Sequence, residues 1–571
     1  MMSGHFIVCG MGQVGYRVVA LLRRLGESVT VITQTTRDEW LHAGGMRGVT
    51  VLTGDARDPQ LLAAADVQNA RALIAVTNHD LVNIEIALDA KQLRPDLPVV
   101  VRLFDQVLAH QLEASFDIRR ALAMSTLAAP TFAAAAMGEQ IVGSFTLDET
   151  LFMIGQLTLN EASPLAHLTV REVGAKYRLA VLHRERDEAD VSLVPSPDTV
   201  LHVGDRVTVV GCASDWEKVT PDSAPPVTMT SLVRQCTDFV GHHLHPAFWF
   251  DFVRQVWRNT PMPLRVVFVT INLLTFLSVF VFHFAMNLSL VDALYFIIAT
   301  VTTVGYGDIT PRHASPVLKL YGCLVMLLGS ATVAVLYSII TDFIVTARFQ
   351  QVLGRQRVPQ EGHIVVMGLG NVGYRIVDEL RRVGARLIAI ERNADGAFVE
   401  AVRAHLPVII GDARMRETLV KAGVAQARAV IAATNDDAVN LSIGLTAKQM
   451  NPRLRSVVRL FDADFARKVQ ATLNIDFAIS APALAAPTFV AAALYPDVRD
   501  AFVLDNRLLI VLLHRTVGDD WHGLTPSHLR ATHSVIVLLR KRPPDAYGLA
   551  HDDAPLDRQE EVLAVVWRRL S

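Results

Sequence analysis

A stretch of nine residues, Thr300–Asp308, carries the most distinctive chemistry in this chain, with the sequence Thr-Val-Thr-Thr-Val-Gly-Tyr-Gly-Asp. A bare cation has to exchange its hydration shell for protein oxygens, and stacked rings of backbone carbonyls can supply them. Gly305 and Gly307 permit such a backbone because glycine adopts positive φ without a steric penalty. The hydroxyl of Thr303 would add an innermost ring of oxygens, whereas Tyr306 would point away and brace the loop. The spacing therefore predicts coordination of a dehydrated cation.

Five of these residues resemble the signature of a known family. Thr303, Val304, Gly305, Tyr306 and Gly307 match the sequence Thr-Val-Gly-Tyr-Gly of the tetrameric potassium channels at every position. The resemblance implies a selectivity filter that binds K⁺ at Thr303, Val304, Gly305 and Tyr306, with four chains around a closed axis. A glycine-rich turn in a soluble protein is the alternative, which the position between two apolar segments disfavours.

Further residues around the filter extend this resemblance. Tyr295 and Asp308 are expected to support the filter from behind. Gly329, in the second apolar segment, is expected to be the gating hinge, with Gly322 as the runner-up. Close helix packing is the alternative role for either glycine.

Two apolar segments flank the filter. Val266–Met286 and Leu320–Thr341 contain 21 and 22 residues without Asp, Glu, Lys or Arg, enough for spanning helices. Ser289 and Asp292 predict a capping box that opens a short helix between them, running to about Thr302. Arginines before the first segment and after the second place both termini in the cytoplasm. The sequence thus predicts two membrane spans joined by a re-entrant pore loop.

Composition excludes other classes of protein. The chain has 571 residues, of which 51% are hydrophobic, and a net charge of −2 from 54 basic and 56 acidic residues. This balance gives no sign of nucleic-acid binding. The four cysteines show no metal-ligand or disulfide spacing and suggest a reducing compartment. No signal-peptide pattern opens the sequence, so the first domain is expected to stay in the cytosol.

An internal repeat surrounds the apolar segments: Gly4–Phe132 (copy one) recurs as Gly362–Phe489 (copy two). Each copy alternates short β-branched runs with helical patterns, which is typical of a parallel sheet covered on both faces. In both copies the first run leads into Gly-x-Gly-x-x-Gly, the motif whose backbone approaches a pyrophosphate at a helix N-terminus. The motif residues expected to bind the cofactor are Gly10, Gly12, Gln13 and Gly15 in copy one, and Gly368, Gly370, Asn371, Val372 and Gly373 in copy two.

The two motifs differ at the ribose position. Glu391, 18 residues after Gly373 and followed by Arg392, stands where an acid accepts the ribose hydroxyls in this fold. Copy one has Thr33 and Gln34 there instead, so its ribose contact is missing or replaced. Copy two is therefore expected to bind an adenine nucleotide. For copy one, binding and a vestigial site kept for packing both stay open.

Both copies resemble the RCK domain, which regulates potassium conductance in prokaryotic channels and transporters. The resemblance implies a Rossmann-type fold that binds NAD(H) or an adenine nucleotide. The further residues that it implies are Asp412, Thr434, Asn435 and Arg459 in copy two, with Asp55 and Thr77 in copy one. Turn and helix-capping roles are the plainer alternative for these residues.

A smaller β-rich segment follows each copy and resembles the C-lobe of an RCK domain. A divalent cation is a further candidate ligand at His183, Asp187, Glu188 and Asp190, although a solvated hairpin is favoured there. The expected organisation is residues 1–143 for the first N-lobe, 144–215 for its C-lobe, 216–263 for a linker and interfacial helix, 264–347 for the pore, 348–361 for a second linker, 362–495 for the second N-lobe and 496–571 for its C-lobe.

The predicted fold class is a membrane α-helical pore flanked by two α/β Rossmann-like RCK domains with small α+β C-lobes. The predicted function is a homotetrameric potassium-selective channel of a bacterial-type cell membrane, gated by nucleotide binding to eight cytoplasmic RCK domains. Membrane lipid and the nucleotide are its expected partners, and nucleic acid is not. A non-conducting regulator of potassium transport is the main alternative. An oxidoreductase is disfavoured because no catalytic acid-base or nucleophile group accompanies the glycine motifs, so we expect no enzyme.

Overall fold

The computed structural model describes residues 4–35, 40, 46–104, 106–138, 140–186, 191–193, 195–216, 218–219, 262–352, 359, 361–518, 520–533, 535–541, 547–549 and 554–571. The chain separates into two compact units, one from residues 1–223 and 356–571 and the other from residues 224–355. The predicted interfacial helix within 216–263 and three of the candidate divalent ligands, Asp187, Glu188 and Asp190, lie outside the described residues.

Copy one folds as a six-stranded parallel sheet with strand order β3-β2-β1-β4-β5-β6. This is the order of a dinucleotide-binding fold, and it confirms the predicted sheet. The sixth strand was not predicted, because its four residues run directly into an alanine-rich helix. The strands are β1 (Phe6–Cys9), β2 (Val29–Thr33), β3 (Thr50–Thr53), β4 (Ala72–Ala75), β5 (Val99–Leu103) and β6 (Arg120–Ala123), with helices α1 (Gln13–Arg24), α3 (Pro59–Ala64), α4 (Asp80–Leu93) and α5 (Gln106–Ser115) and the 3₁₀ turn η2 (Val67–Asn69).

Copy two repeats this sheet with strand order β14-β13-β12-β15-β16-β17, again with parallel pairing. The strands of this sheet are buried at its centre and partly exposed at its edges, and burial explains the mostly apolar sequences of the central ones. The strands are β12 (Ile364–Met367), β13 (Leu387–Glu391), β14 (Val408–Ile410), β15 (Ala429–Ala432), β16 (Arg455–Arg459) and β17 (Phe477–Ile479), with helices α14 (Asn371–Arg382), α15 (Val399–Arg403), α16 (Arg416–Lys421), α17 (Asp437–Met450) and α18 (Ala463–Thr472) and the 3₁₀ turn η3 (Val424–Gln426).

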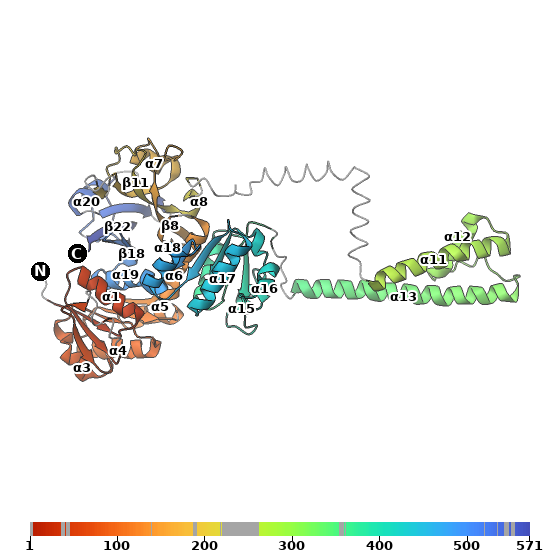
Figure 1. Ribbon diagram of the computed structural model, residues 1–571, viewed down its shortest axis with the longest axis horizontal. Coiled ribbons are helices and arrows are strands. Elements are labelled where there is room, and N and C mark those ends of the chain that lie inside the picture. The colour runs from red at the N-terminus through yellow and green to blue at the C-terminus, as the bar shows by residue number, and fades with distance from the viewer. Residues whose placement is uncertain are drawn as a thin grey trace. The chain divides into compact units, whose positions relative to one another are not determined.

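Two alanine-rich helices, α6 (Met124–Met137) and α19 (Ala481–Leu494), join the copies. Helix α6 of copy one packs on α14 of copy two, and α19 of copy two packs on α1 of copy one, where Figure 1 shows the two helices side by side. Both helices are apolar around their whole circumference, as expected of helices buried on all sides. Phe132 and Phe489 are fully buried in one hydrophobic core that contains residues of both copies. The two copies therefore form a single folded body.

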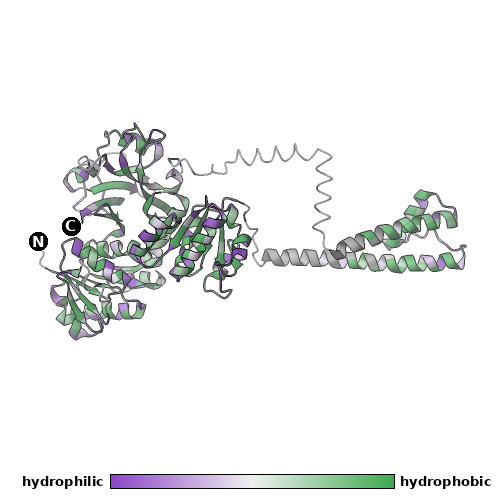
Figure 2. Cartoon of the chain, in the orientation of Figure 1, coloured by the Kyte–Doolittle hydropathy of each residue, from purple (hydrophilic) through white to green (hydrophobic). Residues whose placement is uncertain are grey.

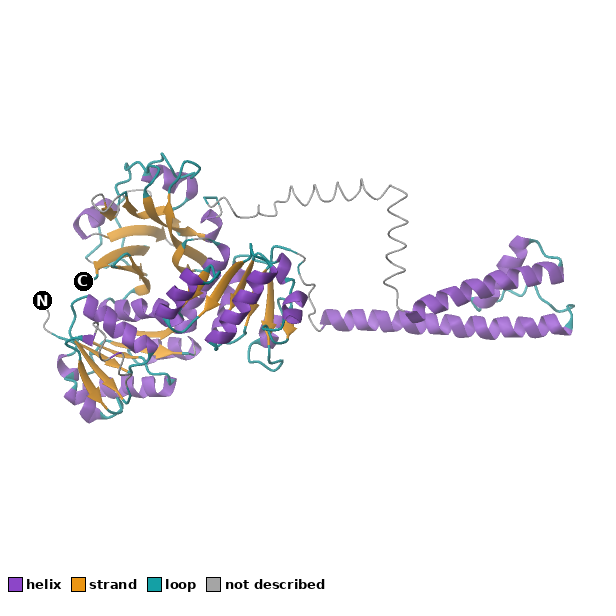
Figure 3. Cartoon of the chain, viewed as in Figure 1, coloured by secondary structure: helices purple, strands orange, loops and turns teal. Residues whose placement is uncertain are grey.

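The C-lobes are two antiparallel five-stranded sheets, with orders β10-β9-β11-β8-β7 and β18-β19-β22-β20-β21. Figure 3 draws the strands of the chain in orange. The C-lobes share a second hydrophobic core that includes Phe145 and Leu182 from one lobe and Leu509 and Trp567 from the other. The first lobe contains β7 (Ile141–Leu147), β8 (Thr150–Thr158), β9 (Ala180–Glu185), β10 (Val191–Leu193), β11 (Arg206–Cys212), α7 (Val170–Tyr177) and α8 (Ala213–Trp216). The second contains β18 (Val498–Leu504), β19 (Arg507–His514), β20 (Val535–Lys541), β21 (Gly548–Leu549), β22 (Glu561–Arg569) and α20 (Pro526–His533).

The other unit consists of three helices, α11 (Met262–Met286), α12 (Leu290–Val301) and α13 (Pro316–Val352), whose coloured turns are predominantly hydrophobic (Figure 2). Within the described residues, one segment, Pro316–Val335 of α13, is long and apolar enough to cross a membrane by length and composition, with a mean hydropathy of 1.8. The apolar segment Leu273–Met286 of α11 is shorter. One half of the predicted capping box opens α12: the Ser289 hydroxyl accepts the backbone N–H of Asp292 at 3.0 Å, and it donates to the Asp292 carboxylate at 2.8 Å.

Candidate functional site

The glycine-rich turn between the first strand and the first helix has the same geometry in both copies. Gly10 and Gly368 have φ of +101° and +91°, which only glycine adopts readily. A Cβ on Gly373 would lie 1.8 Å from the carbonyl oxygen of Gly368, and one on Gly15 would lie 1.9 Å from that of Gly10. The first and third glycines of each motif are therefore required by the turn itself.

The second glycine of each motif has a different environment. A Cβ on Gly370 would meet no atom within 4 Å, and one on Gly12 would meet only the Asn78 side-chain oxygen, at 3.9 Å. Both residues are helix N-caps without a side-chain capping bond. Protein packing does not explain a glycine at either position. Free space beside a helix N-terminus does suit a phosphate that approaches the backbone.

Each turn opens onto a cavity at the carboxyl ends of the parallel strands, of about 690 Å³ in copy one and about 580 Å³ in copy two. Cavities of this size hold small-molecule ligands. The structure brings together most of the predicted cofactor residues of copy two, which line its cavity as Gly368, Gly370, Asn371, Glu391, Arg392, Asp412, Thr434 and Asn435. In copy one the cavity is lined by the predicted Gly10, Gly12, Gln13, Asp55 and Thr77, with Thr33 and Gln34 at the ribose position.

The position expected to bind a ribose has different side-chain contacts in the two copies. Glu391 ends β13, and its carboxylate accepts backbone N–H groups from Leu369 at 2.6 Å, Arg392 at 2.8 Å and Asn393 at 3.1 Å. These contacts hold the carboxylate beside the glycine turn. Thr33, at the same place in copy one, is buried, and its hydroxyl donates to the carbonyl of Thr35 at 2.8 Å. Copy one thus presents no carboxylate at this position.

An acid and an arginine form an ion pair after the third strand of each copy. In copy two the Arg414 guanidinium lies 2.6 Å from the Asp412 carboxylate, and its hydrogen bonds lower the pKa of Asp412 to about 2. In copy one Arg57 pairs with Asp55 at 2.7 Å and also with Glu85 at 2.9 Å. Both acids are therefore ionised and positioned at the rim of their cavities.

A buried arginine fixes the loop after the fourth strand. Arg459, which does not line the cavity, donates to the side chain of Asn435 at 3.0 Å and to the carbonyl of Thr434 at 3.3 Å. Asn440 is fully buried, accepts the backbone N–H of Thr434 at 2.9 Å and donates to the carbonyl of Arg459 at 3.0 Å. Arg459 is therefore a positioning residue for this loop. Copy one has the same contacts among Arg102, Thr77, Asn78 and Asn83.

Two aromatic residues of the cavities were missed from the sequence. Phe398 lines the cavity of copy two and stacks on Tyr374, with ring centroids 4.6 Å apart. Trp40 lines the cavity of copy one and stacks on Tyr16 at 5.0 Å. Both lie after the second strand, where the chain shows no hydrophobic period. Tyr16 and Tyr374, which occupy matching positions in the two motif helices, were the feature of the sequence that could have indicated an aromatic partner in each cavity.

The predicted filter residues follow α12. Thr303, Gly305 and Gly307 have φ of +61°, +56° and +81°, so every second residue has a left-handed backbone. The rings of Tyr295 and Tyr306 stack with centroids 6.3 Å apart, and Tyr295 hydrogen bonds to Asp308. These contacts link both predicted support residues to the loop.

The two glycines of α13 differ in their surroundings. A Cβ on Gly329 would lie 3.1 Å from Cα of Val301, at the end of α12, whereas one on Gly322 would lie 3.8 Å from the Phe282 ring. Gly329 thus permits a close contact between two helices. Its predicted role as a hinge stays a prediction.

The divalent site that was a candidate from the sequence finds no support. Across the described ranges, no group of three or more His, Cys, Asp or Glu side chains could hold a metal ion. His183 is buried, its ring is tilted against Trp567 with centroids 6.2 Å apart, and burial lowers its pKa. His183 therefore belongs to the contact between the C-lobes.

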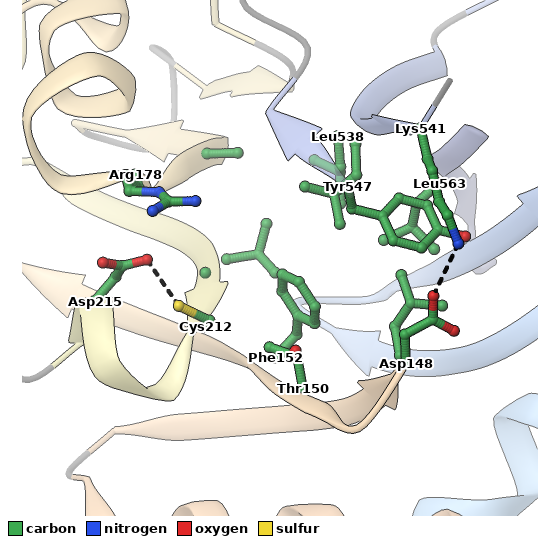
Figure 4. A pocket seen from close by; sticks show the side chains of 15 residues that line it. Asp148, Thr150, Phe152, Arg178, Cys212, Asp215, Leu538, Lys541, Tyr547 and Leu563 are labelled. Carbon is green, nitrogen blue, oxygen red and sulfur yellow. Dashed lines mark hydrogen bonds and ion pairs between the residues drawn. The ribbon is translucent and has the colours of Figure 1, made fainter. Parts of the chain in front are cut away.

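A further cavity of about 490 Å³ lies between the two C-lobes (Figure 4). Phe152 from one lobe and Leu563 from the other contribute to its apolar wall. Lys541 bridges the lobes through Asp148 at 3.3 Å, and the Cys212 thiol donates to Asp215 at 2.7 Å. Most charges at this cavity are thus already paired within the protein.

Comparison with known proteins identifies the domains. The TrkA-N domain matches residues 6–121 and 364–481, the TrkA-C domain matches residues 154–221, and the ion channel domain matches residues 267–346. These matches define the class: a chain with an ion-channel domain and two TrkA-N domains of Rossmann-type fold.

Proteins similar to this chain include potassium channels and Trk system potassium uptake proteins. Probable potassium channel protein 2 of Methanocaldococcus jannaschii is 29% identical over 31% of this chain and 53% of its own length. The voltage-gated potassium channel Kch of Escherichia coli is 26% identical over 32% of this chain and 44% of its own. A solved structure, the GsuK channel, is 15% identical with a TM-score of 0.49, over 98% of this chain and 76% of that one. The chain spans about half the length of these curated relatives. Along the chain the matched domains follow in the order TrkA-N, TrkA-C, ion channel and TrkA-N.

Proposed function

We propose that this chain is one subunit of a homotetrameric potassium-selective channel gated by nucleotide binding to its RCK domains. The observation that carries the proposal is the Thr-Val-Gly-Tyr-Gly sequence with left-handed backbone at Thr303, Gly305 and Gly307, inside the region that matches the ion channel domain. Such a backbone turns successive carbonyls so that they can face an ion path. One chain supplies one filter segment, so four chains complete the rings that replace the hydration shell of K⁺.

In this proposal α11 and α13 are the two spans, and α12 is the pore helix of the re-entrant loop. The Ser289 cap fixes the start of α12, and its C-terminus at Thr302 directly precedes the filter. Four such C-termini would lower the cost of holding a cation at mid-membrane, because the negative end of each helix dipole faces the ion. Arg residues on the outer sides of both spans favour cytoplasmic termini and cytoplasmic RCK domains.

The ligand of copy two is NAD(H) or an adenine nucleotide. Gly370 and the N-terminus of α14 would hold the phosphates, and Glu391 would accept the ribose hydroxyls. The charged side chains lining this cavity are Glu391, Asp412, Asp436, Arg392 and Arg414, which carry a net charge of −1.

Copy one suits a different nucleotide. Apart from His79, the charged side chains that line its cavity among the described residues are Asp55, Arg57 and Arg102, which carry a net charge of +1. A site of this charge without a ribose carboxylate favours a ligand with more phosphate charge, such as ADP or ATP.

Gating would follow from the covalent continuity between the pore and copy two. Helix α13 extends from Pro316 to Val352, beyond the segment long enough to span the membrane. A nucleotide-dependent change in the RCK domains would act on the segment after Asp342 and splay α13.

Flux into liposomes that contain the purified full chain tests the proposal. We expect barium-sensitive flux that prefers K⁺ to Na⁺, and single-channel open probability that changes with NAD(H), ADP or ATP. A matched Gly305→Ala variant should abolish the preference, because alanine disfavours the left-handed backbone there. Absence of K⁺-selective flux would favour a non-conducting regulator instead.

A further inference from the structure

The cavity of copy one is not built from copy one alone. Phe461 and Pro482 of copy two contribute to its wall, together with the glycine turn and Trp40 of copy one. By contrast, the described residues that line the cavity of copy two all belong to copy two. The two nucleotide cavities are therefore unequal in construction.

Phe461 is held rigidly by residues of its own copy. Its backbone N–H donates to both carboxylate oxygens of Asp437, at 3.0 and 3.1 Å, and its carbonyl accepts the Ser480 hydroxyl at 2.8 Å. The Arg459 guanidinium lies over its ring, 4.9 Å from the centroid. The wall that copy two gives to copy one is thus a fixed surface rather than a loose side chain.

The same arginine reaches the nucleotide loop of copy two. Arg459, 8% exposed, donates to Asn435 and to the carbonyl of Thr434, both of which line the cavity of copy two. A continuous set of contacts therefore runs from the cavity of copy two through Arg459 to Phe461 and into the cavity of copy one.

The equivalent residue of copy one has the same local chemistry and a different role. Phe104 lies beneath Arg102, 4.8 Å from its guanidinium, and its backbone N–H donates to Asp80 at 2.8 Å. Its side chain is 44% exposed, and the wall of the copy-two cavity does not include it. Phe104 is thus a matched control for Phe461 within the same chain.

We propose that copy one binds its nucleotide in a composite site, in which Phe461 of copy two packs against the ligand and couples its binding to the state of the copy-two cavity. This inference rests on the proposed nucleotide binding. An aromatic wall of this kind favours a ligand with a planar base. Because coupling between two sites is reciprocal, occupation of either cavity changes the affinity of the other.

Two blocking variants allow each cavity to be measured separately in the full-length, detergent-solubilised protein. Gly370→Asp and Gly12→Asp place a carboxylate where a phosphate would bind, in positions whose surroundings leave room for a side chain. Calorimetric titration with ADP then reports copy one in the Gly370→Asp background and copy two in the Gly12→Asp background.

Phe461→Ala is expected to weaken ADP binding to copy one about fivefold, the size of a lost aromatic contact, and Phe461→Tyr should restore it. Phe104→Ala should leave ADP binding to copy two unchanged. Thermal unfolding of each variant shows whether it folds. If Phe461→Ala does not fold, the ADP affinity of Phe461→Tyr is compared with that of Phe461→Leu.

The outcomes separate the inference from the proposed function. Equal effects of Phe461→Ala and Phe104→Ala, or no effect of Phe461→Ala, would overturn the composite site while nucleotide binding stands. ADP binding to copy two but not to copy one would also overturn it. Absence of binding in both backgrounds for ADP and NADH alike would refute the proposed nucleotide function and the inference with it.

Discussion

Asp500 is a buried carboxyl group whose ionisation should be visible in the stability of the protein. It lies on β18, beside a cavity of about 150 Å³ between the copies. The residue is 4% exposed. Its carboxyl oxygen accepts the Thr488 hydroxyl at 2.5 Å and the backbone N–H of Ala501 at 2.8 Å. Burial raises its pKa from 3.8 to about 7, although Arg499 and Arg120 favour the ionised form.

The direction of the pH effect follows from this raised pKa. Between about pH 4 and pH 7 the unfolded chain releases the proton while the folded chain keeps it, so the free energy of unfolding decreases as the pH rises. The decrease is at most about 1.4 kcal/mol per pH unit and about 4 kcal/mol in total. Above pH 7 both states are ionised and the loss is constant. Asp500→Asn removes the ionisation and keeps an acceptor oxygen, so it should stabilise the protein at pH 8 and leave it unchanged near pH 4.

Urea unfolding of the full-length protein in detergent, followed by tryptophan fluorescence from pH 4.5 to 8.5, measures this difference. Asp412→Asn is the control, because Arg414 lowers the pKa of Asp412 and its removal should never stabilise the protein at neutral pH. Parallel pH profiles for Asp500→Asn and the natural protein would show that Asp500 is ionised when folded and would refute the reasoning.

Three further predictions concern the candidate sites. Glu391→Ala should weaken NADH binding about tenfold or more by calorimetry, since charged hydrogen bonds contribute ~1.5–3 kcal/mol, whereas Thr33→Ala should have little effect; equal effects would contradict the assignment of the ribose site. Gly329→Ala should lower K⁺ flux into liposomes, because its Cβ would lie 3.1 Å from a backbone atom of α12, and Gly322→Ala, with more room, should not; equal flux in both variants would count against this. Gly373→Ala should lower the free energy of unfolding by about 1–3 kcal/mol or more, because its Cβ would lie 1.8 Å from a carbonyl oxygen of the same turn, and unchanged urea unfolding would contradict it.

Local patterns in the sequence predicted much of the fold and of the candidate site. β-branched runs and glycine motifs predicted both parallel sheets, and the internal repeat assigned matching residues in each. The difference between Glu391 and Thr33 could be recognised because both residues end the second strand of their copy, at a similar distance in sequence from the glycine turn. These inferences hold because each depends on residues close together in the sequence.

The contacts between the copies could not be predicted in this way. Nothing near Phe461 in the sequence indicates that it lines the cavity of copy one, since that depends on how α19 packs against α1. The raised pKa of Asp500 likewise depends on complete burial by residues distant in the chain. Helices α6 and α19 are apolar around their whole circumference, which indicates that each is buried on all sides. This pattern does not indicate which helices they pack against.

Because both copies belong to one chain, their sequences can differ, whereas the two subunits of a homodimer have the same sequence. In a symmetric dimer each substitution is inherited by both halves. Here Glu379 of copy two, whose carboxylate accepts the Thr146 hydroxyl at 2.8 Å, corresponds in the repeat to Leu21, and buried Asp500 corresponds to Gly143. One side of the contact can therefore gain titratable groups while the other stays apolar. A single polypeptide can in this way hold two similar domains whose buried contacts differ.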